Sequence, residues 1–171
     1  MYSDEVEEIV AAWSREQPGT DVSSIRIVTP LWRLSTALRS ARQSVLLAHG
    51  MDHSSLDVLG ALRRSGPPYR LTAGELSRRC RVTAGATTQR VIPLEEAGFV
   101  RRLRDEPDRR TVYVELTPVG SARLDEIFAD VMAADEGVLA TLNPTDRNDL
   151  QRILGAWMRG AGLDHTAPDR R

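Results

Sequence analysis

Residues 71–120, LTAGELSRRCRVTAGATTQRVIPLEEAGFVRRLRDEPDRRTVYVELTPVG, decide the fold of this chain. The first half of this stretch predicts two short helices joined by a tight turn. Thr72 and Glu75 form a Thr-x-x-Glu capping box, which predicts a helix from the next residue onward. The hydroxyl of Thr83 can cap a second helix, and Gly98 supplies a C-terminal stop for it.

The second half of the stretch predicts a β-hairpin. Residues 100–104 and 111–116 alternate apolar with polar side chains, as half-exposed strands do. The loop between them holds a proline and several charged residues, among them two adjacent arginines. A compact helix pair followed by an arginine-tipped hairpin is typical of proteins that contact duplex DNA in two grooves.

The second helix begins with small, polar and cationic residues. Ala86, Ile92 and Leu94 can take its inward positions, which leaves the other side chains of its first half outside. Small hydrogen-bonding side chains can enter a major groove without steric conflict. The candidate DNA-contacting residues of this helix are Thr83, Ala84, Gly85, Thr87, Thr88, Gln89 and Arg90.

Short motifs stand in a fixed order along this region: Glu75-Leu76, Val82-Thr83, Leu94-Glu95, Gly98-Phe99-Val100, Asp108-x-Arg110 and Leu116-Thr117-Pro118-x-Gly120. Together they resemble the MarR family of winged helix-turn-helix regulators, most closely over residues 55–125. The resemblance implies a mainly α fold with a small β-hairpin wing. In that fold a winged helix-turn-helix is flanked by N- and C-terminal dimerisation helices.

The resemblance also implies how the protein acts. The second helix would read the major groove, and Arg109 or Arg110 of the wing would enter the minor groove, with Asp108 holding the wing arginine through an ion pair. A homodimeric repressor would bind a palindromic operator and be released by a small anionic or phenolic ligand. The alternative is a helical protein-interaction module that carries the winged motif without binding DNA.

The charges of the chain are segregated. Residues 60–110 hold twelve arginines against six acidic residues, and the rest of the chain holds eleven arginines against eighteen. A basic segment therefore lies within a chain of formal net charge −1. Phosphate contacts need local cation density, and an acidic surface elsewhere does not prevent them. The charge pattern favours double-stranded DNA as a partner.

The composition argues against several other classes of protein. No apolar run approaches the roughly 18 residues of a transmembrane helix, so we expect no membrane association. The acidic N-terminus is unlike a signal peptide, and a single cysteine indicates a reducing compartment, so we expect a cytoplasmic protein. No nucleophile–base pair, Gly-rich phosphate loop or pair of catalytic carboxylates occurs, so we expect neither an enzyme nor a cofactor.

The flanks of the motif predict amphipathic helices within one domain, residues 1–171. Helices are expected over residues 4–15, from Ser23 or Ser24 to residue 48, over residues 54–64 with Ser54 as cap, and after Thr117-Pro118 and Asn143-Pro144. Residues 1–49 and 118–161 would form the dimerisation region, 54–117 the DNA-binding lobe and 162–171 a flexible tail. Alternatively, the flanking helices fold back over the motif as an ordinary monomeric core.

Two prolines depart from the pattern of the resembled family. Pro93 falls inside the second helix of the motif, where it removes the hydrogen bond to the Gln89 carbonyl, so we expect this helix to bend. Pro30 falls inside the long N-terminal helix and is expected to kink it or delay its start.

A ligand site is also implied by resemblance. A urate-responsive branch of the family carries an extra N-terminal helix with a Trp, an Asp before the motif and two Arg near it. The corresponding ligand-binding candidates, with one neighbouring arginine, are Trp13, Arg15, Asp57, Arg90 and Arg102. Two guanidiniums and an indole can hold a flat anion by bidentate pairing and stacking. Alternatively, Trp13 is a core residue, Asp57 balances a helix N-terminus, and the arginines contact DNA phosphates.

The sequence gives weaker signals for a metal site and for a redox-active cysteine. His49, His53 and Asp57 stand four residues apart, a spacing suited to a metal on one helix, but Gly50 interrupts that helix, so we expect no metal site. Cys80 falls on the inward face of its helix, where thiols are usually inert, so we expect no redox sensor.

Overall fold

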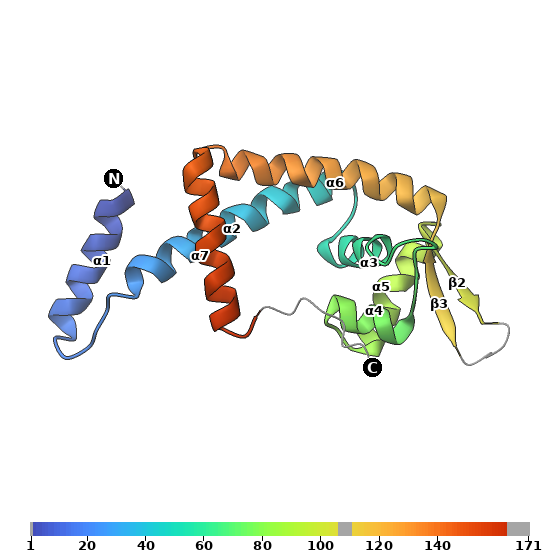
Figure 1. Cartoon of the computed structure of the whole chain (residues 1–171), viewed down its shortest axis with the longest axis horizontal. Helices are drawn as coiled ribbons and strands as arrows, with labels where there is room; N and C mark the ends of the chain where they lie inside the picture. Colours follow the sequence, from blue (N-terminus) through green and yellow to red (C-terminus); the bar gives the residue numbers. More distant parts are fainter. Residues whose placement is uncertain (1, 106–110, 164–171) are drawn as a thin grey trace. The chain divides into compact units, whose positions relative to one another are not determined.

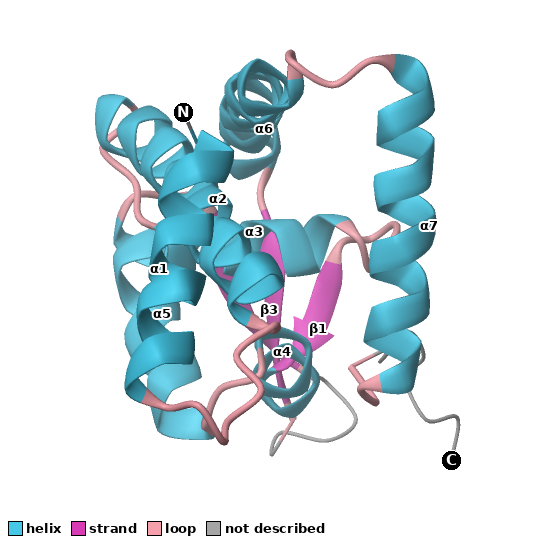
Figure 2. Ribbon diagram, turned by 90° about the vertical axis from the view of Figure 1, so that its left-hand side faces the viewer, coloured by secondary structure: helices cyan, strands magenta, loops and turns pink. Residues whose placement is uncertain are grey.

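The computed structural model describes residues 2–105 and 111–163 (Figure 1). In chain order its elements are α1 (Tyr2–Glu16), α2 (Ile25–Ala48), α3 (His53–Arg63), β1 (Arg70–Thr72), α4 (Ala73–Cys80), α5 (Ala84–Glu96), β2 (Val100–Arg104), β3 (Val112–Leu116), α6 (Pro118–Leu139) and α7 (Pro144–Gly160). The chain divides into two compact units, residues 1–135 and 136–171, with the boundary inside α6. Helices dominate and the strands are few and short (Figure 2), which confirms the predicted fold class. The bounds proposed for a dimerisation region and a DNA-binding lobe stay a prediction.

The sheet holds one strand more than the predicted hairpin. β3 lies between β2 and β1 and pairs antiparallel with both, so that Val114 stands opposite Arg102 on one side and Leu71 on the other. β1 was missed because a strand of three residues has too little alternation to be seen in sequence, and it exists only through its pairing with β3. This pairing ties the start of α4 to the base of the hairpin.

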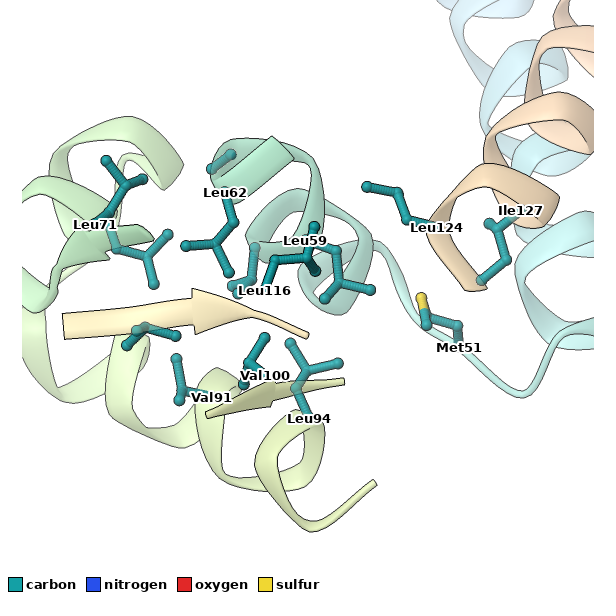
Figure 3. Packing of buried hydrophobic residues seen from close by; sticks show 14 of the residues in the cluster. Met51, Leu59, Leu62, Leu71, Val91, Leu94, Val100, Leu116, Leu124 and Ile127 are labelled. Carbon is teal, nitrogen blue, oxygen red and sulfur yellow. The ribbon is translucent and has the colours of Figure 1, made fainter. Parts of the chain in front are cut away.

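The core of the first unit lies among α3, α4, α5 and the sheet (Figure 3). Leu59 and Leu62 of α3 and Leu76 of α4 are fully buried, and Val100 and Leu116 bring the strands into the same cluster. Burying one such leucine contributes about 1.5–3 kcal/mol relative to leaving it exposed. The residues that α6 adds to this core are Leu124, Ile127 and Val131.

The helices α4 and α5 begin at the side-chain caps predicted from sequence. Thr72 Oγ1 accepts a hydrogen bond from the backbone N of Glu75 at 3.3 Å, and Glu75 Oε2 accepts one from the backbone N of Thr72 at 2.8 Å. The hydrogen bonds from Thr72 hold the pKa of Glu75 below its usual range. Thr83 Oγ1 accepts from the backbone N of Ala86 at 3.2 Å, which fixes the first turn of α5.

The cap of α3 differs from the prediction. Asp52 rather than Ser54 is the N-cap residue, because its carboxylate accepts from the backbone N of Ser55 at 2.7 Å and from the Ser54 hydroxyl at 3.0 Å. A carboxylate at this position also places a negative charge at the positive end of the helix dipole. α3 therefore begins at His53.

β3 turns directly into α6 at a tight joint with the start of β2. The backbone N of Thr117 donates to the Phe99 carbonyl at 3.0 Å, and the Thr117 hydroxyl donates to the Gly98 carbonyl at 2.7 Å. That hydroxyl also accepts from the backbone N of Gly120 at 3.0 Å. A Cβ on Gly120 would stand 2.0 Å from the Phe99 carbonyl oxygen, so the joint accepts only glycine as built. The predicted helix start at Thr117-Pro118 is confirmed.

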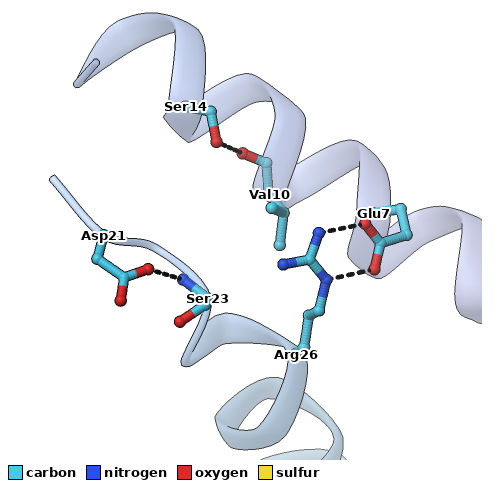
Figure 4. A network of polar contacts seen from close by, with 6 residues as sticks. All are labelled: Glu7, Val10, Ser14, Asp21, Ser23 and Arg26. Carbon is cyan, nitrogen blue, oxygen red and sulfur yellow. Dashed lines mark hydrogen bonds and ion pairs between the residues drawn. The ribbon is translucent and has the colours of Figure 1, made fainter. Parts of the chain in front are cut away.

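α1 packs along α2 (Figure 4). Val6 and Val10 of α1 are buried, and Glu7 forms a bidentate ion pair with Arg26 of α2, with both N···O distances 2.7 Å. An ion pair this exposed contributes little to stability. Apolar burial is therefore the main attachment of α1.

α2 starts without delay despite its internal proline. The helix begins at Ile25 and continues through Pro30, and its N-cap Ser24 makes no side-chain capping hydrogen bond. The expected delay of its start is wrong. The large apolar side chains that α2 leaves exposed are Ile27, Val28, Trp32, Leu34 and Leu47.

In the second unit, α7 begins as predicted. Asn143 Oδ1 accepts from the backbone N of Asp146 at 2.9 Å, and Pro144 follows in the first turn. Every side chain of α7 is at least partly exposed, including the apolar Leu150, Ile153, Leu154, Trp157 and Met158. Within the described residues, no helix combines the length and apolar character needed to cross a membrane.

Candidate functional site

The first turns of α5 present a small polar surface. Ala84, Gly85, Thr88 and Gln89 are exposed, as is the capping residue Thr83. The Thr88 hydroxyl donates to the Ala84 carbonyl at 3.1 Å. Its Oγ1 can still accept a hydrogen bond from a DNA base. A helix end of this composition can approach the edges of bases closely.

Thr87 does not belong to this surface, and its assignment as a DNA contact is corrected. Its side chain is only 3% exposed. The Thr87 hydroxyl lies 2.7 Å from the Ser77 hydroxyl of α4 and donates to the Thr83 carbonyl at 3.1 Å. It therefore joins the two helices of the motif. Val91 is the buried residue one turn later, whereas Ile92, expected to face inward, is only partly buried.

Pro93 does not end α5. The helix continues to Glu96, and the Pro93 carbonyl accepts from the backbone N of Ala97 at 3.0 Å. The exposed residues of the first half end at Gln89, whose carbonyl is the acceptor that Pro93 cannot reach with a backbone N–H.

Exposed arginines lie on the elements that adjoin α5. They are Arg78 and Arg79 of α4, Arg81 in the following turn, and Arg101, Arg102 and Arg104 of β2. Arg101 pairs with Glu115, so part of this charge is neutralised within the sheet. The predicted wing residues Asp108, Arg109 and Arg110 lie outside the described residues.

Arg90 lies against the N-terminal part of α3, beside a second predicted residue. Its Nη1 is 3.9 Å from Oδ2 of Asp57, which is longer than a hydrogen bond. This Nη1 is buried and has no hydrogen-bond partner among the residues that the structure describes. The structure thus brings together two of the five proposed ligand residues.

The remaining ligand candidates are not joined to this pair. Arg102 is held by Glu95: its Nε lies 3.4 Å from Glu95 Oε2 in an ion pair, and its backbone N donates to Oε1 at 3.2 Å. Trp13 is 51% exposed on α1, so it is not the core residue of the alternative interpretation. Arg15 is likewise exposed on α1, which packs on α2.

Electrostatic effects extend from this pair to two neighbours. Burial acts to raise the pKa of Asp52, but hydrogen bonds from Ser55 and the nearby charge of Arg90 outweigh it, and the pKa is lowered. Burial raises the pKa of the Cys80 thiol, and the negative charge of Asp57 raises it further. Cys80 is partly buried, and a thiol with a raised pKa is a weaker nucleophile than an ordinary cysteine.

A crevice that the sequence did not reveal opens between α3 and α6, with α2 at one side. Its volume is about 460 Å³, and Asp57 is among its lining residues. Arginines and apolar side chains line it together: Arg42, Arg63, Arg64, Leu56, Leu124, Phe128, Val131 and Met132. These residues come from α2, from α3 and the residue that follows it, and from α6, so no local sequence pattern could reveal the crevice.

The histidines do not form the metal site suggested by their spacing. His49 follows the end of α2, where its Nε2 lies 2.7 Å from Oδ2 of Asp130 on α6. His53 begins the separate helix α3. Within the described residues, no group of three or more His, Cys, Asp or Glu side chains is arranged to hold a metal ion.

Comparison with known proteins adds independent findings. Residues 49–111 match the model of the MarR family. The chain is 28% identical over 151 residues to the HTH-type transcriptional regulator PecS of Dickeya dadantii, covering 88% of this chain and 91% of that one. It is 31% identical over 124 residues to the HTH-type transcriptional repressor Rv2887 of Mycobacterium tuberculosis, covering 72% of this chain and 87% of that one. The MarR family regulator Sco3205 of Streptomyces coelicolor, solved in complex with DNA, matches with a TM-score of 0.69 and 23% identity, over 88% of this chain and 96% of that one.

Proposed function

The chain belongs to the MarR family of transcriptional regulators, and from this premise we propose that it binds duplex DNA sequence-specifically and represses transcription. The observation that carries the proposal is the exposed first half of α5, where Gly85, Thr88 and Gln89 offer small or hydrogen-bonding side chains to a major groove. The basic segment of residues 60–110 supplies cations for the phosphates. Rv2887, a relative over most of its length, is named as a repressor.

The proposed active form is a homodimer on a palindromic operator. In the first unit, α2 exposes Trp32 and Leu47 by 68% and 66%, and in the second unit α7 exposes Trp157 by 51%. Exposed apolar surface of this kind usually marks an interaction site. A two-fold axis would place two copies of α5 on half-sites about 34 Å apart, one turn of the duplex.

Selection of bound duplexes from random DNA tests this function. A palindromic consensus supports the proposal for specificity and symmetry together. Gln89→Ala should then change the preferred base at its position in each half-site, a contact worth roughly 1–3 kcal/mol. Gln151→Ala on α7 serves as the matched control and should keep the consensus. If Gln89→Ala instead weakens all sequences equally, Gln89 does not read bases.

A protein-interaction module that does not bind DNA is the rival function, and salt separates the two. The affinity of a DNA-binding protein for any duplex falls steeply between about 50 and 200 mM salt, because binding releases counterions from the phosphates. Fluorescence anisotropy measures this dependence. Absence of duplex binding even at low salt would favour the rival.

We propose that the wing contributes affinity rather than sequence preference. Arg109 and Arg110 are adjacent in the basic segment and are placed by resemblance at the wing tip. Arg110→Ala should weaken binding to every duplex to a similar degree, whereas Arg152→Ala, an exposed arginine of α7, should not. Unchanged affinity at low salt for both Arg109→Ala and Arg110→Ala would disprove this assignment.

We also propose that a flat aromatic or carboxylate anion binds beside Asp57 and Arg90 and releases the DNA. The unpartnered Nη1 of Arg90 and the crevice lined by Asp57 support this location. The guanidinium of Arg90 cannot form its full set of hydrogen bonds to a ligand and to a DNA phosphate at the same time. By linkage, DNA must weaken ligand binding by the same factor by which the ligand weakens DNA binding. Trp13 and Arg102 are proposed to close on the ligand in the liganded state.

Titration with urate and simple phenolic acids tests the effector. The wild-type protein should bind at least one of these compounds and release operator DNA, and the double variant Trp13→Phe, Arg102→Ala should respond more weakly. If the wild type binds none of them, or the double variant responds identically, the effector site is wrong. The DNA-binding proposal would stand unaffected.

A further inference from the structure

One face of α3 carries a histidine that neither the family resemblance nor the ligand candidates include. His53 and Asp57 are four residues apart on α3, so they lie on the same face one turn from each other. Arg90 approaches this face, because its Nη1 lies 3.9 Å from Asp57 and its charge also acts on Asp52, the residue before His53. His53 therefore lies on α3 between the two carboxylates that Arg90 influences.

Two buried nitrogen atoms, one of His53 and one of Arg90, lack hydrogen-bond partners among the described residues. They are Nε2 of His53 and Nη1 of Arg90. Buried polar side-chain atoms in folded proteins are nearly always hydrogen-bonded. A guanidinium nitrogen can only donate, and an imidazole nitrogen donates in the matching tautomer. Each of the two atoms therefore lacks an acceptor that the described residues could supply.

We infer that His53 is an effector-contacting residue beside Asp57 and Arg90, and that the effector is a planar anion whose oxygens accept hydrogen bonds from His53 Nε2 and from Arg90 Nη1. The inference rests on the effector site proposed above. Asp57 can only accept when ionised, so it favours an N–H or O–H on the neighbouring edge of the ligand. Hydroxylated aromatic acids and acidic purines combine these groups. Aromatic acids without a hydroxyl lack the donor.

The single cysteine of the chain provides a readout that does not depend on DNA. Cys80 is partly buried, and its thiol is within electrostatic reach of both Asp57 and Arg90. A ligand held by these residues should slow the reaction of Cys80 with N-ethylmaleimide. The wild-type protein should therefore show protection by urate and by 4-hydroxybenzoate, and less protection by benzoate at the same concentration.

Substitutions of His53 test the inference through probe affinity, measured by calorimetry, and through Cys80 protection. His53→Leu should weaken binding of urate and 4-hydroxybenzoate roughly ten- to a hundredfold, the loss expected for one hydrogen bond to a charged group. His53→Gln, whose amide can still donate, should retain much of the affinity. His49→Gln is the matched control, because His49 pairs with Asp130 on α6, and it should bind as the wild type does. DNA affinity without probe should be the same in all variants.

The outcomes separate this inference from the function on which it rests. If His53→Leu binds and protects as the wild type does, the role of His53 is overturned and the effector site remains. If the wild type binds no probe and Cys80 is not protected, the effector site fails together with the role of His53. Should His53→Leu be unstable, His53→Gln and His53→Asn decide: the longer amide should retain binding, the shorter one should lose it, and equal affinity of the two would overturn the inference.

Discussion

In the lobe from α3 to β3, Leu59, Leu62 and Leu76 are fully buried, whereas α2 keeps Trp32 and Leu47 about two-thirds exposed. The lobe therefore supplies most of a core that Leu46 of α2 and three residues of α6 complete. The exposed residues of α2 gain stabilisation only when something else covers them, and a second copy of the chain is the proposed cover. The two regions should respond differently to mutation and to protein concentration.

The helix starts differ in the same way. In the lobe, the side chains of Asp52, Thr72 and Thr83 each accept a hydrogen bond from a backbone N of the first turn. At the start of α2, Ser24 makes no such bond. The lobe helices are defined locally as well as by packing, whereas α2 depends on its neighbours.

The largest expected effect comes from comparing Leu59→Ala with Leu47→Ala. Truncating Leu59 leaves a cavity in the lobe and should lower the free energy of unfolding by about 2–5 kcal/mol. Leu47 is 66% exposed, so its truncation at low protein concentration should change that free energy by no more than about 0.5 kcal/mol. Urea unfolding followed by circular dichroism measures both.

Protein concentration sharpens this comparison. If α2 is covered in a dimer, the cost of Leu47→Ala should appear at concentrations where the dimer forms, because association stabilises the folded state by mass action. The cost of Leu59→Ala should be large throughout. Equal costs for the two variants in dilute protein would remove the distinction between the regions.

A smaller effect is expected from Gly120→Ala. Its Cβ would meet the Phe99 carbonyl oxygen at 2.0 Å, so the joint between β3 and α6 must open, at a cost of about 1–3 kcal/mol. Gly19→Ala, in the connection between α1 and α2, is the control, since no atom lies within 4 Å of the added Cβ. Thermal unfolding compares them. A Gly120→Ala protein as stable as the Gly19→Ala protein would show that the joint yields freely.

The smallest effect concerns the caps. Thr72→Ala should lower the free energy of unfolding by about 0.5–2 kcal/mol, and Ser24→Ala should hardly change it, because only Thr72 caps its helix through the side chain.

The effect of Glu75→Gln on stability should depend on pH. Hydrogen bonds from Thr72 lower the pKa of Glu75, so the stabilisation by its carboxylate is present above the ordinary carboxyl pKa and is lost as pH falls through the lowered value. Urea unfolding at neutral and acid pH should show the Glu75→Gln penalty shrinking in acid.

The elements that sequence predicted are those decided within a few residues. The caps Thr72, Thr83 and Asn143 each act on a backbone N three residues later, and the prolines at positions 118 and 144 mark helix starts directly. The exposed first half of α5 was predicted from the same local pattern. The residues of other elements that pack against α5 could not be predicted in this way.

The errors arose where a distant residue decides. Thr87 was assigned to the DNA-contacting surface because it stands in the first half of α5, but Ser77 on the preceding helix holds it inside. Arg102 pairs with Glu95 rather than with the other ligand candidates. β1 exists only because β3 lies beside it. None of these contacts produces a periodic pattern in the sequence. The proximity of Arg90 and Asp57 was predicted only because the chain resembles the MarR family.

The joint at Thr117 and Gly120 determines how motion passes through the molecule. Hydrogen bonds cross it from Thr117 to Gly98 and Phe99, and the contact between Gly120 and Phe99 leaves no clearance for a pivot. The start of α6 and the base of the hairpin therefore rotate as one rigid body. A rotation of α6 would move β2 and β3 by the same angle, so residues farther from the joint would move farther. A hairpin fixed in a groove would, by the same mechanics, restrain the rotation of α6.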